Sequence, residues 1–272
     1  MVLGENTFIL IGDFMDAKLS GVKAVFLDLD GTIYLGGNLI TGALEFLSRC
    51  KEQGVKRYFL SNNSSRSVEQ YVAKLNGMNI PCEPEDILLS THDLLSWLAK
   101  NDITRTWAIA TKGMCQMMED VGISTRDDDP QYVVLGYDTE IDYNKISTAS
   151  IHMHKGVPLV ASHPDMVCPS PDGGLPDVGA YLAMLKVTTG YDPVHITGKP
   201  NPGMIMHKIE ELGLKPSECA MIGDRLYTDM EMAIRADCVS VLVLSGEATN
   251  DDLSLSGKSV SVVVDSVDDL LR

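Results

Sequence analysis

The chain alternates between strand-like and helix-like segments along most of its length, and this alternation constrains its fold more than any other feature. Apolar runs of strand character are separated by longer segments with helix-end signals, such as the capping-box pair Ser67 and Gln70. Because parallel strands need helical crossovers, the pattern predicts an α/β fold with helices on both faces of parallel sheets. The predicted strands are 24–29, 57–60, 87–90, 106–110, 132–136, 158–162, 219–222 and 239–244. The predicted helices are 42–53, 67–77, 91–100, 112–121, 144–155, 177–189, 202–213 and 228–236.

Composition and charge argue against several classes of protein. The 272 residues are 44% hydrophobic and 22% charged, which is ordinary for a globular chain with a full core. The formal net charge of −16 and the lack of a Lys/Arg run argue against a nucleic-acid polymer as partner. No apolar stretch approaches the roughly 20 residues that span a bilayer, so no membrane partner is expected. An anionic substrate would therefore need local positive groups, such as a metal ion, to receive it.

The cysteines and the N-terminal segment indicate a cytoplasmic protein. The six cysteines are widely spaced and form no CxxC pair, so neither a zinc site nor a disulfide framework is expected. Residues 1–20 contain a short apolar run, but they lack a basic start and carry acidic side chains. We interpret this segment as an N-terminal extension rather than a signal peptide.

Asp28 and Asp30 form the strongest local feature, in the motif DLDGT directly after the first apolar run. Two carboxylates two positions apart on a strand face the same side, and they can converge once the strand gives way to a loop. Carboxylates this close need a cation or a shared proton, and Gly31 permits a tight turn or the close approach of a ligand. Such a pair also occurs at ordinary strand ends, so alone it does not decide the function.

Three further polar clusters each fit an ordinary loop when taken alone. The hydroxyl and amide groups of 61–64 (SNNS) could donate to a phosphate or cap a helix. Lys199, in the loop GKPNP, could neutralise developing negative charge or simply be solvated. Asp224 and Asp229, in GDRLYTD, could bind a hard cation through oxygen or begin a helix.

Taken together, the four clusters indicate a more specific chemistry. All of them follow apparent strands, so a parallel sheet would bring them to one edge, where ligands bind in such folds. The set supplies carboxylates for a nucleophile and a metal, hydroxyl donors and a lysine. These are the groups that phosphoryl transfer requires.

This ordered set, DLDGT, LSNNSS, GKPNP and GDRLYTD, resembles the four motifs of the haloacid dehalogenase superfamily. The stretch 28–40 with the following TGA, and the SHPD of 162–165, resemble more specifically its NagD-like phosphatases. That group includes relatives of 4-nitrophenylphosphatase, pyridoxal phosphate phosphatase and phosphoglycolate phosphatase. The resemblance covers about 22–270. It implies a Rossmann-like parallel-sheet core and a Mg²⁺-dependent phosphatase that acts on small phosphomonoesters.

The resemblance also implies roles for the catalytic residues. Asp28 would attack phosphorus and form an aspartyl-phosphate, while Asp30 would protonate the leaving alkoxide and then activate water. Lys199 would bridge the phosphate and Asp28, which eases the repulsion between two anions.

Mg²⁺ would be held by Asp28, by Asp224 and by the backbone carbonyl of Asp30. Asp229 and Thr32 would lie behind these ligands and orient them.

Substrate contacts follow from the same resemblance. Ser61 would hold a phosphate oxygen, helped by backbone groups at Asn62 and Asn63. In the middle of the chain, His163 and Asp165 would bind the substrate. Many relatives have Asn where this chain has His163, so the resemblance does not specify the contact with the leaving group.

The resemblance also implies an inserted α/β cap domain in the long segment between Asn63 and Lys199, which we place at 101–191 with boundaries within about 15 residues. The core would then be discontinuous, over 1–100 and 192–272. A cap that closes over the sheet edge would exclude water and contact the leaving group. Its loop 165–174 (DMVCPSPDGG) is either a specificity segment or a plain connector. We expect surface or packing roles for the histidines that offer no set suited to a hard metal, His152, His154, His195 and His207.

Two other functions compete with hydrolysis. A signalling module that senses a phosphorylated ligand also gathers acidic residues, a hydroxyl and a lysine around one Asp, but it needs no general acid/base such as Asp30. A phosphomutase on the same fold remains open, whereas a dehalogenase would not need Asp30 and the metal set. The leaving group is also open among a sugar phosphate, a nucleotide, phosphoglycolate, pyridoxal phosphate and an aryl phosphate. Relatives can pair through their caps, so the chain could form a homodimer.

Overall fold

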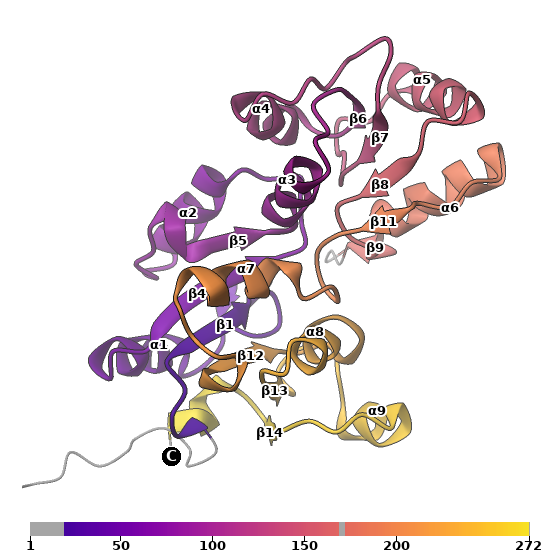
Figure 1. The fold of residues 1–272 in the computed structure, drawn as a ribbon. Coiled ribbons are helices and arrows are strands. Elements are labelled where there is room, and N and C mark those ends of the chain that lie inside the picture. Colours follow the sequence, from indigo (N-terminus) through magenta and orange to yellow (C-terminus); the bar gives the residue numbers. More distant parts are fainter. Residues whose placement is uncertain (1–18, 169–171, 272) are drawn as a thin grey trace, which may run out of the picture.

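A computed structural model describes residues 19–168 and 172–271 and has an α/β architecture with two parallel sheets (Figure 1). The larger sheet has the strand order β14-β13-β12-β1-β4-β5, and all of its neighbouring strands pair in parallel. Its strands are β1 (Ala24–Asp28), β4 (Lys56–Ser61), β5 (Ile87–Leu89), β12 (Cys219–Gly223), β13 (Val239–Val243) and β14 (Val262–Val264). This confirms the predicted α/β class and its Rossmann-like parallel core.

Helices cover both faces of this sheet because its central strands are apolar on both sides. In β1, Val25 and Leu27 pack into one core cluster and Phe26 packs into the other, and all three side chains are fully buried. One face is covered by α1 (Ala43–Glu52) and α2 (Val68–Gly77), and the other by α7 (Gly203–Glu211) and α8 (Glu231–Arg235). A short helix, α9 (Asn250–Ser256), packs beside β13 and β14.

The second sheet has the order β11-β8-β7-β6 and is also parallel. Its strands are β6 (Thr106–Ile109), β7 (Tyr132–Leu135), β8 (Leu159–Ala161) and β11 (His195–Ile196). Its faces are covered by α5 (Tyr143–His154) and α6 (Val178–Thr189) on one side and by α3 (Ser90–Lys100) and α4 (Lys112–Asp120) on the other. A small antiparallel pair, β9 (Val167–Cys168) and β10 (Leu175–Pro176), contacts α6.

We propose that this second sheet and its helices form the inserted cap. Helix α3 and strand β11 lie just outside the predicted limits of 101–191 but within the margin of about 15 residues. Leu94 and Leu98 of α3 pack in one cluster with strand residues of the second sheet, and β11 pairs with β8. The cap unit therefore begins and ends slightly beyond the predicted positions.

Local differences from the predicted elements have simple causes. Ser90 begins α3 instead of ending the preceding strand. The helix predicted at 228–236 starts as a π-type turn, Leu226–Met230, and becomes α-helical only in α8. The hairpin of β2 (Tyr34–Leu35) and β3 (Asn38–Leu39), and strands β9, β10 and β11, were not predicted, because two residues carry no periodic pattern.

Some sequence expectations fall partly outside the described residues, namely the N-terminal extension up to residue 18 and positions 169–171 of the loop 165–174. Within the described ranges, no helix combines the length and apolar character needed to cross a membrane.

Candidate active site

Three of the four polar clusters meet at the carboxyl edge of the larger sheet, as predicted. β1 ends at Asp28, β4 ends at Ser61 and β12 ends at Gly223. The fourth cluster corrects the prediction, because Lys199 follows β11 of the second sheet rather than a strand of the first. Its loop returns to the larger sheet, where the ammonium group of Lys199 contacts the Asp28 carboxylate.

Lys199 is the central positive charge of the site. Its side chain is almost fully buried, and Nζ pairs with Asp28 Oδ1 and lies 2.7 Å from Asp229 Oδ1. Burial alone would lower the pKa of Lys199, but the Asp229 and Asp28 carboxylates outweigh it and raise the pKa above its usual value. Lys199 is therefore a permanent ammonium group that fixes Asp28 at the mouth of the cleft.

The carboxylates of Asp28, Asp224 and Asp229 could together hold a metal ion, since oxygen atoms of all three lie within 4.8 Å of one another. Asp224 is 2% exposed, and its Oδ2 accepts the backbone N–H of Glu247 at 2.8 Å. Its Oδ1 is buried and has no hydrogen-bond partner among the described residues. Burial, together with the Asp28 and Asp229 charges, raises the pKa of Asp224 to about 7. A hard divalent cation would satisfy this oxygen and neutralise the repulsion, so the residues fit Mg²⁺.

Two glycines make room for the Asp224 carboxylate. A Cβ atom on Gly31, whose φ is +93°, would lie 2.3 Å from Asp224 Oδ2. A Cβ atom on Gly246 would lie 2.0 Å from the same oxygen. Ser245 Oγ donates to the Gly31 carbonyl at 2.7 Å and joins the two loops. Both loops therefore close around Asp224 in a way that larger residues would prevent.

Asp30 lies at the open side of the cleft and is exposed to solvent. Partial burial by the surrounding protein raises its pKa, which the Gly36 N–H and the Lys74 charge partly offset. A raised pKa favours the protonated form that a general acid needs. The geometry is therefore compatible with the general acid/base role.

The loop after β4 presents Ser61 to the cleft. Ser61 Oγ shares a hydrogen bond of 2.7 Å with Tyr71 OH on α2 and accepts the Asn63 N–H at 3.2 Å. Asn63 Oδ1 accepts the N–H and the hydroxyl of Ser65 at 3.0 and 2.6 Å. The Asn63 side-chain oxygen therefore binds within the loop itself, which is compatible with the prediction that backbone groups here contact a phosphate.

Asn62 connects the two sheets through its side chain. Its Oδ1 accepts the Lys199 N–H at 2.8 Å, and its Nδ2 donates to the Lys199 carbonyl at 3.0 Å. The same Nδ2 donates to Asp165 Oδ2 at 3.1 Å. The buried amide of Asn62 therefore positions the lysine loop and contacts the proposed cap.

The prediction that His163 contacts the substrate directly is wrong. His163 is 0% exposed, and its ring nitrogens are engaged by Ser162 Oγ and by Asp177 Oδ1, both at 2.9 Å. Ser162 Oγ in turn bonds Ser64 Oγ at 3.0 Å, so the histidine belongs to a buried network behind the cleft wall.

Asp165 does line the cleft. His163, Asp165 and Asp177 also have ligand atoms within 4.8 Å of one another, but His163 and Asp177 already bond each other.

Thr32 does not have the contact that the predicted orienting role requires. Its side chain is fully buried, and Oγ1 has no hydrogen-bond partner among the described residues.

The cleft, of about 220 Å³, is also lined by residues that the sequence analysis does not predict, namely Tyr71, Arg66, Lys74 and Arg225. The sequence contains a pattern that indicates two of these residues, because Tyr71 and Lys74 lie one helical turn apart on the helix that follows LSNNSS.

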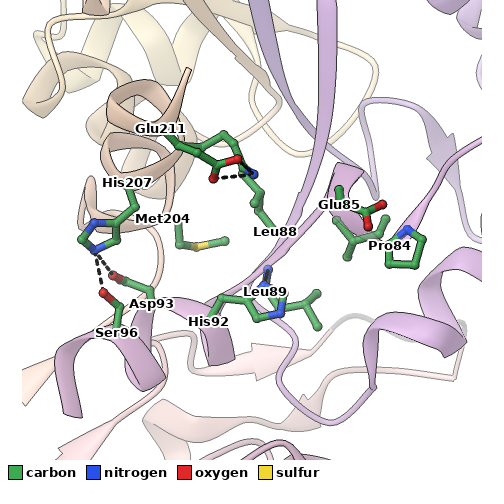
Figure 2. Close-up of a pocket in the computed structure, with 12 residues that line it drawn as sticks. Pro84, Glu85, Leu88, Leu89, His92, Asp93, Ser96, Met204, His207 and Glu211 are labelled. Carbon is green, nitrogen blue, oxygen red and sulfur yellow. Dashed lines mark hydrogen bonds and ion pairs between the residues drawn. The ribbon is translucent and has the colours of Figure 1, made fainter. Parts of the chain in front are cut away.

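A second cavity, of about 310 Å³, lies between α3 and α7 and away from Asp28 (Figure 2). At one end the buried Asp93 accepts the Gly198 N–H at 2.9 Å. Beside it, His207 Nε2 lies 3.2 Å from Ser96 Oγ and 3.9 Å from Asp93 Oδ1. This cavity holds no group that touches the reacting atoms, but Asp93 supports the residue before Lys199. The side chain of His207 is thus partly exposed and makes polar contacts at this cavity.

Comparisons with known proteins agree with this geometry. Residues 25–124 match the model of the haloacid dehalogenase-like hydrolases, and residues 196–270 match that of the HAD-hydrolase-like family. An acid sugar phosphatase of Staphylococcus aureus (strain MRSA252) is 32% identical over 85% of this chain and 90% of its own length. The chain belongs to the haloacid dehalogenase superfamily.

Solved structures match this chain to the NagD-like subfamily, and a putative NagD protein is 34% identical with a TM-score of 0.86 over 91% of this chain and 96% of its own. A 4-nitrophenylphosphatase from Thermotoga maritima is 34% identical, with a TM-score of 0.90 over 94% of this chain and 98% of its own. A p-nitrophenyl phosphatase from Archaeoglobus fulgidus is 26% identical, with a TM-score of 0.84 over 92% and 98%. NagD from E. coli K-12, at 22% identity and a TM-score of 0.84 over 91% and 97%, shows the likeness of fold alone. The enzyme is a phosphatase of this superfamily.

Proposed function

We propose that the enzyme is a Mg²⁺-dependent phosphatase that hydrolyses small phosphomonoesters through an aspartyl-phosphate on Asp28. The observation that carries this proposal is the pairing of Asp28 with Lys199, close to Asp224, whose Oδ1 has no hydrogen-bond partner among the described residues. This arrangement supports roles for the three residues as nucleophile, permanent cation and metal ligand.

The side chains support a two-step displacement. Asp28 attacks phosphorus while Lys199 reduces the repulsion between the carboxylate and the phosphate. Asp30 gives its proton to the leaving oxygen and then takes one from water, so that the acyl phosphate is hydrolysed. Ser61 Oγ, held by Tyr71, and the backbone of the next residues donate to the phosphate oxygens. Mg²⁺, when bound by Asp28, Asp224 and the Asp30 carbonyl, would supply further charge neutralisation and orientation.

The substrate class rests on the relatives. Their names specify sugar phosphates and nitrophenyl phosphates. We infer a small phosphorylated metabolite as the substrate, because the cleft is small and the chain carries a net charge of −16.

The proposal is tested by phosphate release from a panel of phosphomonoesters that includes 4-nitrophenyl phosphate. The wild type and the isosteric Asp28→Asn variant are compared with Mg²⁺ and with EDTA, and circular dichroism checks that the variant folds. Release that requires Mg²⁺ and disappears in Asp28→Asn is expected. Phosphate transfer without net release would indicate a phosphomutase. Tight ligand binding without any turnover would indicate a sensing module.

A burst experiment separates the two steps. 4-Nitrophenol needs little help from a general acid, so Asp30→Asn should still form the acyl phosphate but should fail to hydrolyse it. We expect a burst of about one nitrophenol per enzyme followed by very slow turnover. A proportional loss of both phases would argue against a covalent intermediate that Asp30 resolves.

A further inference from the structure

Two cations that line the active-site cleft form no ion pair within the part of the chain that the structure describes. The cleft is lined by four basic residues, of which Lys199 pairs with Asp28 and Asp229, and Arg225 pairs with Glu247 at 2.9 Å. In contrast, Arg66 and Lys74 form no ion pair or side-chain hydrogen bond within the described residues. In a chain with a net charge of −16, this is an unusual place to leave positive charge uncompensated.

Lys74 is held in place rather than free in solvent. Its side chain is half-buried, and Nζ lies 3.8 Å from the centre of the buried Tyr34 ring, a cation–π contact. Burial and the Arg66 charge lower its pKa, while Asp30 acts in the opposite direction. Arg66 and Lys74 thus lie close enough to repel each other, and the nearby Asp30 forms no ion pair with either of them among the described residues. An anion bound beside both cations would relieve this repulsion.

The position of this pair relative to the phosphate loop is defined by α2. Tyr71 bonds Ser61 Oγ, and Lys74 stands three residues later on the same helix face, roughly 5–6 Å away at the Cβ atoms. Arg66 follows Ser65, which is fixed by two hydrogen bonds to Asn63. Both cations therefore line the same cleft as Ser61, beside the loop that follows β4.

We propose that Arg66 and Lys74 form a second anion subsite, so that the preferred substrate is a phosphomonoester with a further carboxylate or phosphate on its leaving group. This inference rests on the proposed phosphatase function and narrows its substrate class. The phosphate that reacts binds at Asp28 and Lys199, while the second anion fills the site between the two unpaired cations.

Substrate pairs that differ only in the second anion test the subsite. 3-Phosphoglycerate is compared with glycerol 3-phosphate, in which a hydroxymethyl group replaces the carboxylate. Fructose 1,6-bisphosphate is compared with fructose 6-phosphate for a second phosphate. We expect kcat/KM to favour the anionic member of at least one pair about tenfold or more, and that pair identifies the anion.

Charge variants then assign the preference to these residues. Arg66→Gln and Lys74→Gln should each reduce the preference about tenfold, mainly through KM, whereas Arg66→Lys and Lys74→Arg should keep most of it. Lys51→Gln removes an exposed cation on α1, outside the cleft, and is the matched control for net charge. Its preference should equal that of the wild type.

The outcomes are distinct. Wild-type activity without any preference, or equal losses on both members of each pair in the Gln variants, would overturn the second subsite while leaving the phosphatase intact. Complete inactivity of the wild type on every ester, 4-nitrophenyl phosphate included, would overturn the proposed function and the subsite with it.

Discussion

Gly31→Ala is the substitution for which the structure predicts the sharpest effect. A Cβ atom at this position would lie 2.3 Å from Asp224 Oδ2, whereas ordinary contacts begin at 3.4 Å, so the carboxylate must move by about 1 Å. A displacement of that size in a catalytic group costs roughly 100-fold in rate. The positive φ of +93° adds about 1–2 kcal/mol of backbone strain, independently of the carboxylate.

Gly156→Ala is the matched control, because Gly156 has the same φ of +93° but nothing within 4 Å of its Cβ position. Both variants should lose stability in urea unfolding through the shared backbone strain, and Gly31→Ala should lose more because of its contact with Asp224. Only Gly31→Ala should lose roughly 100-fold in kcat/KM with 4-nitrophenyl phosphate and need more Mg²⁺ for half-maximal activity. If Gly31→Ala keeps the activity of Gly156→Ala, then the Asp224 position does not govern catalysis and the assigned metal site is wrong.

Three further predictions follow from contacts described above. Because burial and neighbouring charges raise the folded pKa of Asp224 from 3.8 to about 7, the native state binds more protons than the unfolded state between these values. The stability of the metal-free protein should therefore fall from pH 5 to pH 7.5, and it should fall less steeply in Asp224→Asn. Mg²⁺ should restore stability most at pH 7.5. Melting curves in EDTA and in Mg²⁺ measure these effects, and equal slopes of stability against pH in the wild type and in Asp224→Asn would contradict the prediction. Tyr71→Phe removes the partner of Ser61 Oγ and should lower kcat/KM about fivefold to tenfold, a loss that would be absent if Ser61 does not touch the phosphate. Asp93→Ala leaves the Gly198 N–H without its buried acceptor and should cost about 1–3 kcal/mol in urea unfolding, against no more than a few tenths for the exposed Asp251→Ala.

The sequence predicts the fold and the core of the site well because both depend on local pattern. The strand before Asp28 and the alternation around it determine the parallel sheet, and the sheet edge brings Asp28, Ser61 and Asp224 together. What could not be predicted depends on distant contacts. The burial of His163 arises from its bonds to Ser162 and to Asp177, and no local pattern reports that a ring will be enclosed on both sides.

The position of Lys199 shows the same limit. Its loop was expected after a strand of the main sheet, yet β11 has only two residues and pairs with β8 of the other sheet. The chain returns to Asp28 because Asn62 binds the Lys199 backbone on both sides of the residue, through its N–H and its carbonyl. Such a long-range bond cannot be read from spacing.

Helix α3 follows β5 without an intervening loop, yet Leu94 and Leu98 pack with Ala108 and Val134 of the second sheet. The helix therefore follows a strand of the larger sheet along the chain, but its apolar side chains pack against the second sheet. A chimera that takes the second sheet from a relative but joins it after Lys100 would set these leucines against foreign side chains. A junction between Leu89 and Ser90 would keep that interface intact, so an exchange that preserves the packing of the second sheet must include helix α3 as well.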